Sequence, residues 1–395
     1  MKKGRTVKRA SLISVVAMAG LSAVALAGCA SGDTGGGDAA TRACVILPDA
    51  ASSPRWESLD RKYLEEGLEA AGFETDIQNA QGDTNKYATI ADQQLSQGCG
   101  VMLLVDYNGA GAAVAEKATA EGIPVIAYDR PIAGADYYVS FDNVEVGRLQ
   151  GQAVVEGLEA AGKDPATATV VYIGGDAADG NAAMFKEGAV EVMEAAGITA
   201  AAEPPGVWDG EKSATNFEQA LTSLNGVVDA VWAANDTNAA GVITILDKNG
   251  LVVPVSGQDA SVAGLQNVLL GKQWATVYKP VKLEADAAIE VAIALLSGET
   301  PEADLELDDG TPFITVDPIY IRPDSVKDVV EAGDATAAEL CTGDVAAKCT
   351  EFGVKYVFNI GVASLCSLCK ICHKLSCFFW RSASSNQSLS YTVCA

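Results

Sequence analysis

From residue 43 onward, short apolar runs alternate with amphipathic segments of helical length. Residues 44–48 form a compact apolar run that predicts a strand, and Trp56, Leu59 and Tyr63 then recur at the i, i+3 and i+7 spacing of a helix. Residues 100–107 form a longer, nearly continuous apolar run, which is typical of a strand buried on both faces of a parallel sheet. This order of strand, helix and strand predicts repeated βαβ units.

The same alternation continues through the next two hundred residues. Further strands are predicted at 75–80, 124–129, 168–175, 230–236, 252–259 and 274–279, with helix-length segments between most of them. The fold class predicted is therefore α/β with parallel sheets. A chain of 395 residues exceeds what one hydrophobic core usually organises, so we expect two domains.

Polar side chains follow several of these strands at their carboxyl ends. In open α/β sheets, ligands bind in the crevice outside those ends, so the side chains could converge on one site. Any single position is better explained by a strand that meets a polar loop, but the recurrence at four strands predicts a binding cleft. The positions are Asp129-Arg130, Asn235-Asp236, Gln258-Asp259 and Lys279.

Charge narrows the possible ligands. The chain has 52 Asp and Glu residues against 27 Lys and Arg residues, a formal net charge of -25. Such a chain repels the phosphates of nucleic acids, so we expect no nucleic-acid partner.

The N-terminal residues have the pattern of a secretion signal. Basic residues up to Arg9 precede an uncharged stretch over 10–27, which ends in Leu-Ala-Gly before Cys29. We interpret residues 1–28 as a lipoprotein signal peptide, because Ser and Gly residues dilute the apolar run below what a transmembrane helix, the alternative, requires. Cys29 would then carry the lipid, and residues 29–42 would form a flexible tether that anchors the protein to the outer face of the cell membrane.

Outside the cytosol, cysteines tend to form disulfides. Cys44 and Cys99 open the first and third predicted strands, which are neighbours in a sheet of order 2-1-3, so we expect them to pair. Cys341 and Cys349 are a second expected pair, closing a short loop. Unpaired buried thiols remain the alternative for both.

The last 44 residues differ in composition. From Phe352 onward the chain has no Asp or Glu, but it contains five of the ten cysteines and the only histidine. Residues 369–373, Cys-Lys-Ile-Cys-His, match a haem-attachment pattern, but no second axial ligand or enclosing framework accompanies them, and the cysteines are too crowded for a zinc ribbon. We therefore expect no metal and no cofactor, and we expect residues 351–395 to be an atypical tail outside the fold.

The sequence lacks the motifs of common hydrolases and nucleotide-binding enzymes, and its single histidine disfavours Ser-His-Asp chemistry. The carboxylates of Asp129 and Asp259 could suggest glycoside hydrolysis, but neighbouring Arg130 and Lys279 would keep them ionised instead of supplying a raised-pKa acid. We expect no enzyme activity. Charged and amide groups together with Trp208, which lies in a predicted loop, instead suit a sugar, because hydroxyls need hydrogen-bond partners and a ring needs an aromatic face.

Seven short stretches between residues 43 and 323 resemble the type 1 periplasmic binding protein family, and within it the D-xylose-binding proteins are the most similar. They are 53–56 (SPRW), 123–130 (IPVIAYDR), 139–143 (VSFDN), 207–210 (VWDG), 234–236 (AND), 256–259 (SGQD) and 276–280 (TVYKP).

The resemblance implies two Rossmann-like lobes with parallel sheets, joined by three crossovers. The N-terminal lobe would comprise residues 43–141 and 280–314, and the C-terminal lobe residues 142–279 and 315–350. The sugar contacts that the resemblance implies are Arg55, Asp129 and Arg130 from the first lobe, Asn181, Trp208, Asn235 and Asp259 from the second, and Lys279 at a crossover.

The function implied is that of a substrate-binding protein of an ABC importer, a monomer that delivers a monosaccharide, with D-xylose the expected sugar, to membrane permease subunits. Two alternatives share the fold. A ligand carrier for a chemoreceptor is compatible with the sequence, whereas the effector domain of a sugar-responsive repressor would need a helix-turn-helix where the lipobox lies.

Overall fold

The computed structural model describes residues 42–355. The predicted signal peptide, the predicted lipidation site Cys29, the predicted tether up to residue 41 and the tail from residue 356 lie outside the described residues. Within them, no helix combines the length and the apolar character that crossing a membrane requires.

The first sheet has seven strands in the order β10-β11-β5-β4-β3-β1-β2, and all of its pairings are parallel except β10 with β11. The strands β3, β4 and β5 are fully buried, and so is β1 after Arg42, as their apolar runs predict. Their bounds are β1 Arg42–Leu47, β2 Glu74–Asn79, β3 Val101–Leu104, β4 Val125–Tyr128, β5 Tyr137–Phe141, β10 Leu305–Glu306 and β11 Pro312–Val316.

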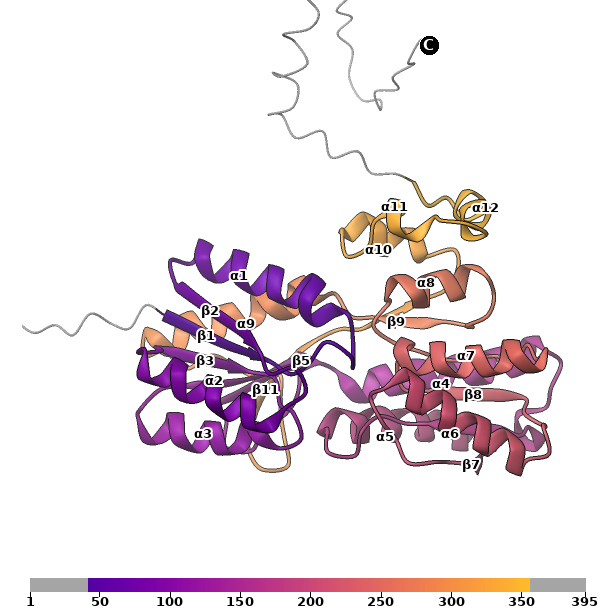
Figure 1. Cartoon of the computed structure of the whole chain (residues 1–395), viewed down its shortest axis with the longest axis horizontal. Coiled ribbons are helices and arrows are strands. Elements are labelled where there is room, and N and C mark those ends of the chain that lie inside the picture. The colour runs from indigo at the N-terminus through magenta and orange to yellow at the C-terminus, as the bar shows by residue number, and fades with distance from the viewer. Residues whose placement is uncertain (1–41, 356–395) are drawn as a thin grey trace, which may run out of the picture. The chain divides into compact units, whose positions relative to one another are not determined.

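Helices cover both faces of this sheet (Figure 1). Because successive side chains of a strand point to opposite faces, Val45 of β1 packs in the core formed with α1 and α9, whereas Ile46 packs in the core formed with α2 and α3. A π-helical turn, η1, leads into α1. The elements are η1 Trp56–Asp60, α1 Arg61–Ala70, α2 Thr84–Ser96, α3 Ala110–Ala120 and α9 Val281–Leu296.

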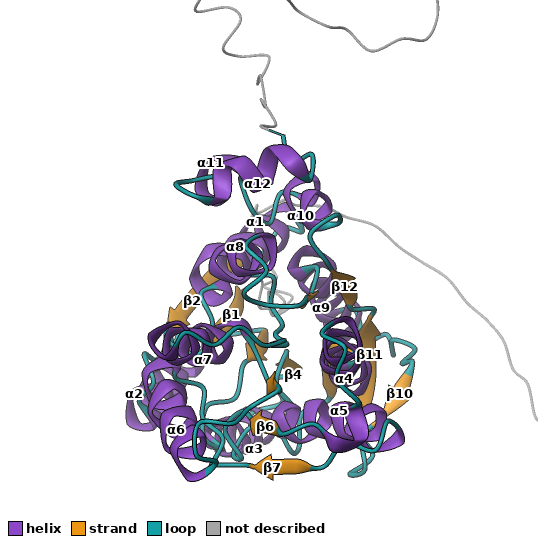
Figure 2. Ribbon diagram, turned by 90° about the vertical axis from the view of Figure 1, so that its right-hand side faces the viewer, coloured by secondary structure: helices purple, strands orange, loops and turns teal. Residues whose placement is uncertain are grey.

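The second sheet has three parallel strands in the order β7-β6-β8. The helices α4 and α5 pack on one face and α6 and α7 on the other, an arrangement that is visible in Figure 2. The elements are α4 Asn143–Ala160, η2 Pro165–Thr167, β6 Val170–Ile173, α5 Gly180–Ala195, β7 Ala200–Ala202, α6 Gly210–Ser223, β8 Ala230–Ala233 and α7 Asp236–Asn249.

A third core packs the end of the described chain against α8 and the strand pair β9 and β12. It contains residues of α8, of the antiparallel pair β9 and β12, and of three short helices that we call the C-terminal module, residues 326–354. The elements are α8 Val262–Leu269, β9 Thr276–Tyr278, β12 Ile319–Ile321, α10 Val326–Ala332, α11 Ala337–Leu340 and α12 Val345–Glu351. We call the seven-stranded sheet with its helices the first lobe, and the remaining elements the second lobe.

The structure differs from the sequence predictions in several details, including two in the second lobe. Residues 252–259 form no regular strand, and only Val255 makes an isolated bridge, to Val231 of β8. The fold also extends a few residues past the predicted end of the lobe at 350, because α12 ends at Glu351 and Val354 is buried in the third core.

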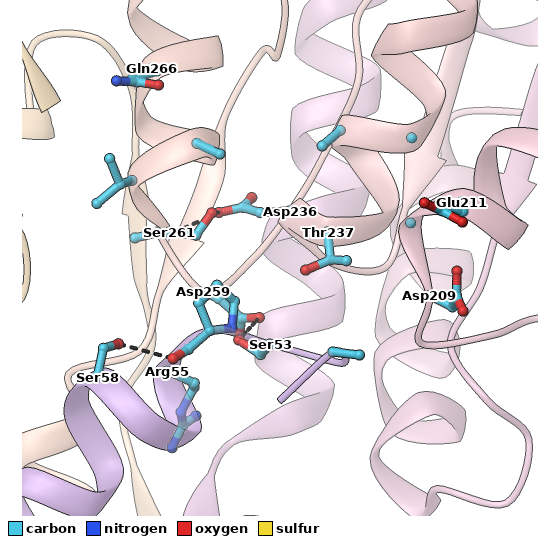
Figure 3. Close-up of a pocket in the computed structure, with 18 of the residues that line it drawn as sticks. Ser53, Arg55, Ser58, Asp209, Glu211, Asp236, Thr237, Asp259, Ser261 and Gln266 are labelled. Carbon is cyan, nitrogen blue, oxygen red and sulfur yellow. Dashed lines mark hydrogen bonds between the residues drawn. The ribbon is translucent and has the colours of Figure 1, made fainter. Parts of the chain in front are cut away.

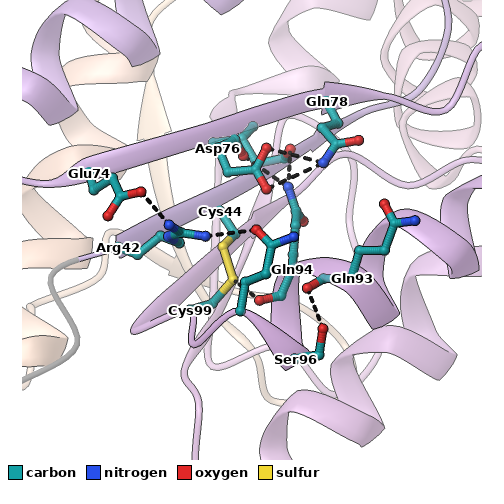
Figure 4. The surroundings of a disulfide bond; sticks show 11 residues. Arg42, Cys44, Glu74, Asp76, Gln78, Gln93, Gln94, Ser96 and Cys99 are labelled. Atoms are coloured by element: carbon teal, nitrogen blue, oxygen red, sulfur yellow. Dashed lines mark hydrogen bonds and ion pairs between the residues drawn. A yellow bond between two sulfur atoms is a disulfide. The ribbon is translucent and has the colours of Figure 1, made fainter.

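The structure contains a disulfide between Cys44 of β1 and Cys99, which precedes β3, with their Cα atoms 5.9 Å apart (Figure 4). The pair lies in the core formed with α2 and α3, and the side chain of Gln94 donates hydrogen bonds to the carbonyl oxygens of Val45 and Asp76 beside it. A second disulfide joins Cys341 and Cys349 within the C-terminal module.

Candidate functional site

One small cavity lies between the two lobes and collects every sugar contact that the resemblance implied. Arg55, Asp129, Arg130, Asn181, Trp208, Asn235, Asp259 and Lys279 all line it. The structure adds six residues that the sequence did not name as sugar contacts, and these are Ser52, Ser53, Trp56, Asp179, Phe185 and Gln258.

Two aspartates of the site, Asp129 and Asp259, have positive backbone φ angles. Asp129, directly after β4, has φ 60°, and Asp259 has φ 93°. The positive φ region is strained for residues other than glycine, so the fold must hold both in place. It does so by backbone hydrogen bonds, from the Asp129 amide to the carbonyl oxygen of Val139 (2.9 Å) and from the Asp259 amide to that of Val277 (2.8 Å).

Arg55 connects the cavity to a buried acidic cluster in the first lobe. Its guanidinium donates to both oxygens of Asp60 (2.8 and 2.6 Å), to Glu284 Oε2 (2.5 Å) and to Asp129 Oδ2 (2.9 Å). Burial works against the charge of Arg55, but these carboxylates raise its pKa above the ordinary value. Its donors are therefore largely engaged by the protein, and Arg55 orients Asp129 as well as lining the cavity.

Lys279 lies between the carboxylates of the two lobes. Its Nζ is 3.1 Å from Asp259 Oδ1 and 3.8 Å from Asp129 Oδ2. Burial alone would raise the pKa of Asp129, but Lys279, followed by Arg55 and Arg130, brings it below the ordinary value. Asp129 is therefore an ionised hydrogen-bond acceptor at neutral pH.

Arg130 forms an ion pair with Asp179, the N-cap residue of α5. Burial raises the pKa of Asp179, and Arg130 opposes that rise. Arg130 also donates to the carbonyl oxygen of Asp106 (3.0 Å), while Asp179 Oδ2 accepts a hydrogen bond from the indole of Trp208 (3.0 Å). The pair therefore fixes an arginine of one lobe and a tryptophan of the other.

Aromatic rings form parts of the cavity wall. Trp208 packs edge to face on Phe185, with ring centroids 6.3 Å apart. The guanidinium carbon of Arg130 lies 5.3 Å from the centroid of the Trp56 ring. The Trp208 ring also lies against the backbone of Gly175, where a Cβ atom would come within 2.1 Å of the ring. Glycine at 175 is therefore required for this position of the indole.

The amide side chains of the cavity differ in what they still offer a ligand. Asn181 accepts from Tyr138 Oη (2.7 Å) and donates to the carbonyl oxygen of Asp129 (2.7 Å), so it stabilises the site backbone. Asn235 donates to the carbonyl oxygen of Ser52 (3.0 Å) and caps α7. Gln258 is 2% exposed, and its Oε1 has no hydrogen-bond partner among the described residues. Gln258 is thus the amide with a free acceptor.

The charges lining the cavity balance. Its cations are Arg55, Arg130 and Lys279, and its anions are Asp129, Asp179 and Asp259. The cavity volume is about 20 Å³, which is close to the ~10–15 Å³ that a single buried water needs. A larger ligand therefore requires side chains that now meet across the cleft to separate.

A wider groove of about 970 Å³ adjoins the cavity and is drawn in Figure 3. Ser53, Arg55 and Asp259 line both spaces, and the hydroxyl of Ser53 donates to Asp259 Oδ2 (3.0 Å) across the cleft. Asp236, also on the groove, accepts hydrogen bonds from Gln273, Thr276 and Ser261. Burial, with a contribution from Asp259, raises the pKa of Asp236 to about 7.

Comparisons with known proteins bear on the family and the fold of this chain. A family model described as "Periplasmic binding protein domain" matches residues 44–300. The D-xylose-binding periplasmic protein of Escherichia coli (strain K12) is 34% identical over 289 residues, which cover 70% of this chain and 85% of that protein. The corresponding protein of Haemophilus influenzae is 35% identical over the same shares.

Among solved structures, an ABC transporter solute binding protein from Clostridium phytofermentans with bound β-D-glucose matches with a TM-score of 0.68 and 27% identity, covering 76% of this chain and 99% of that one. A carbohydrate transporter solute binding protein from Chloroflexus aurantiacus in complex with D-glucose matches with a TM-score of 0.66 and 27% identity, covering 75% and 97%. The predicted fold class is thereby confirmed, and the chain belongs to the periplasmic binding protein family.

Proposed function

We propose that this protein is an extracytoplasmic receptor that closes its two lobes around a neutral monosaccharide, D-xylose in preference, and delivers it to the permease of an ABC importer. The observation that carries this proposal is the shared cavity, which combines charged hydrogen-bonding groups with aromatic rings and draws them from both lobes.

The chemistry of the cavity suits sugar hydroxyls. A hydroxyl both donates and accepts, so it can bridge a carboxylate such as Asp129 and a cation such as Lys279, and hydrogen bonds to charged groups are the stronger kind. Gln258 Oε1 supplies a further acceptor. The Trp208 ring offers a face to the C–H side of a pyranose.

The balance of charge favours a neutral ligand. A sugar acid would add one uncompensated anion to a buried site whose three cations already face three carboxylates. We therefore expect uronic acids and sugar phosphates to bind far more weakly than the parent sugars.

The preference for xylose rests on the relatives. The D-xylose-binding periplasmic proteins of two bacteria are 34% and 35% identical to this chain. A multiple sugar-binding periplasmic protein of Azospirillum brasilense is 30% identical, and the two solved structures at 27% identity hold glucose. A single hydroxymethyl group separates the pentose from the hexose, and such a difference changes affinity by only ~1–3 kcal/mol.

The location and partners follow from the same proposal. Lipidation of Cys29 would hold a monomeric receptor at the outer face of the cell membrane, next to its permease, and neither catalysis nor a cofactor is required. A role as a sugar-binding ligand carrier for a chemoreceptor uses the same site and is the alternative.

A thermal-shift panel tests the ligand class. A ligand that binds only the folded protein raises the melting temperature, by an amount equivalent to ~2.7 kcal/mol at one hundred times Kd. We expect D-xylose to give the largest shift, D-glucose a smaller one, and D-glucuronate none at matched concentration. A larger shift with glucuronate than with glucose would contradict the neutral-ligand proposal.

A further inference from the structure

One carboxylate outside the sugar cavity holds hydrogen bonds from two tyrosines that are far apart in the sequence. Tyr63 Oη donates to Asp334 Oδ1 (2.5 Å), and Tyr278 Oη donates to Asp334 Oδ2 (2.6 Å). Asp334 follows the C-cap glycine of α10 in the C-terminal module and is partly buried. Burial, reinforced by Asp334, raises the pKa of both tyrosines, so both hydroxyls remain protonated donors at neutral pH.

The two hydrogen bonds differ in what they join. Tyr278 belongs to β9, and its ring packs in the same third core as the C-terminal module, so its bond to Asp334 lies within the second lobe. Tyr63 belongs to α1 and packs in the core between α1, α9 and the first sheet. The bond from Tyr63 to Asp334 therefore connects the two lobes.

This bond also differs from the other contacts across the cleft. The pair Arg130 and Asp179 and the pair Ser53 and Asp259 line the cavity of about 20 Å³, so a sugar must displace or rearrange them to enter. Neither Tyr63 nor Asp334 lines that cavity. Asp334 lines the adjoining groove instead, so a sugar held in the cavity would not displace the bond between them.

We propose that Asp334 is a latch that stabilises the closed arrangement of the lobes through Tyr63 and so sets sugar affinity without touching the sugar. Lobe opening must break this bond, whereas a sugar enclosed between the closed lobes leaves it intact. The latch holds a fraction of the sugar-free molecules closed, and it slows release of bound sugar. The effect on affinity rests on the proposed function, whereas the effect on the sugar-free protein does not.

Tyr63→Phe and Tyr278→Phe form a matched pair, because each keeps the ring and removes one hydroxyl from the same carboxylate. For Tyr63→Phe we expect D-xylose to bind roughly three- to tenfold more weakly, mostly through faster dissociation in stopped-flow tryptophan fluorescence. Small-angle scattering without sugar should give a larger radius of gyration than wild type. Tyr278→Phe should match wild type in affinity, dissociation rate and radius, although it can melt at a lower temperature.

Asp334→Asn tests the same hydrogen bond from its other side, because it removes the charge that strengthens the bond from Tyr63. Combined with Tyr63→Phe it should weaken binding little beyond either single change, since both act on one bond. Wild-type affinity, dissociation rate and sugar-free radius in Tyr63→Phe would overturn the latch. Equal losses in Tyr278→Phe would also overturn it, because Asp334 would then act by holding the C-terminal module. If no sugar bound even the wild type, the proposed function would fail. The radius of gyration without sugar would still show whether the Tyr63–Asp334 bond holds the lobes closed.

Discussion

The Nε atom of Arg130 lies 3.0 Å from Oδ2 of Asp179, so an arginine that follows β4 of the first lobe is ion-paired with the N-cap residue of α5 in the second. Both side chains are buried, which leaves either one costly to remove alone.

Asp179→Asn should therefore weaken sugar binding by roughly tenfold or more and lower the melting temperature, because it leaves the buried Arg130 charge without its partner. Asparagine is an equally good N-cap, so α5 should still form. Calorimetric titration with D-xylose and a thermal melt measure the two effects. Asp83→Asn, at the exposed N-cap of α2, is the matched control and should change neither; a control as damaging as the test variant would show that capping, and not the ion pair, is responsible.

Trp208→Ala should reduce affinity at least tenfold, since it removes an aromatic wall of the cavity and a hydrogen bond to Asp179. The fluorescence change on adding sugar should shrink in the same variant. Trp274→Phe is the control, because Trp274 packs on Arg322 away from the cavity. Unchanged xylose affinity in Trp208→Ala would show that the Trp208 ring does not contribute to sugar binding.

The pKa of about 7 at Asp236 predicts a pH dependence of stability. The folded state keeps a proton that an exposed aspartate releases near pH 4, so between about pH 4 and pH 7 the folded state binds more protons than the unfolded state. The contribution of Asp236 to the free energy of unfolding must then fall as the pH rises through this window and level off above pH 7. Urea unfolding of wild type and Asp236→Asn at pH 5 and pH 8 checks this. Wild type should lose more stability between the two pH values than the variant, and equal losses would contradict the shifted pKa.

The two disulfides close loops of different length, so removing them should change the free energy of unfolding by different amounts. Cys44 and Cys99 are 55 residues apart, and Cys341 and Cys349 are 8 apart. Loop entropy alone gives about 4 kcal/mol for the longer loop and about 2.5 kcal/mol for the shorter one. We expect Cys44→Ala/Cys99→Ala to destabilise the protein more than Cys341→Ala/Cys349→Ala in urea titrations. Non-reducing peptide mapping comes first, and alkylated single peptides of Cys44 and Cys99 would show that the longer loop is not closed.

Much of the site could be predicted because its residues follow strands in a recognisable pattern. Asp129 and Arg130 directly follow β4, and Lys279 directly follows β9. The prediction of a regular strand over 252–259 was wrong. Val252 at its start is exposed, and although the segment shares backbone hydrogen bonds with Val231 and with residues 274–277, only Val255 forms a bridge.

The rest of the site depends on contacts that sequence spacing does not encode. Asp179 is indistinguishable in sequence from any other N-cap aspartate, and only the fold brings Arg130 to it. Arg55 was predicted as a sugar contact, but its partnership with Glu284 joins residues 229 positions apart. Gln258 was among the polar groups at the strand ends that predicted a cleft, but the fact that its Oε1 has no hydrogen-bond partner among the described residues is visible only in the structure.

Calorimetric titration of D-xylose into wild type and Asp129→Asn tests the central claim most directly. Asp129 is an ionised acceptor held by Arg55 and Lys279 in the wall of the shared cavity, and asparagine keeps its shape while removing its charge. We predict one sugar per wild-type molecule and an affinity at least about tenfold weaker in the variant, corresponding to roughly 1.5–3 kcal/mol. Equal affinities in the two proteins, or no heat of binding with wild type, would contradict the account.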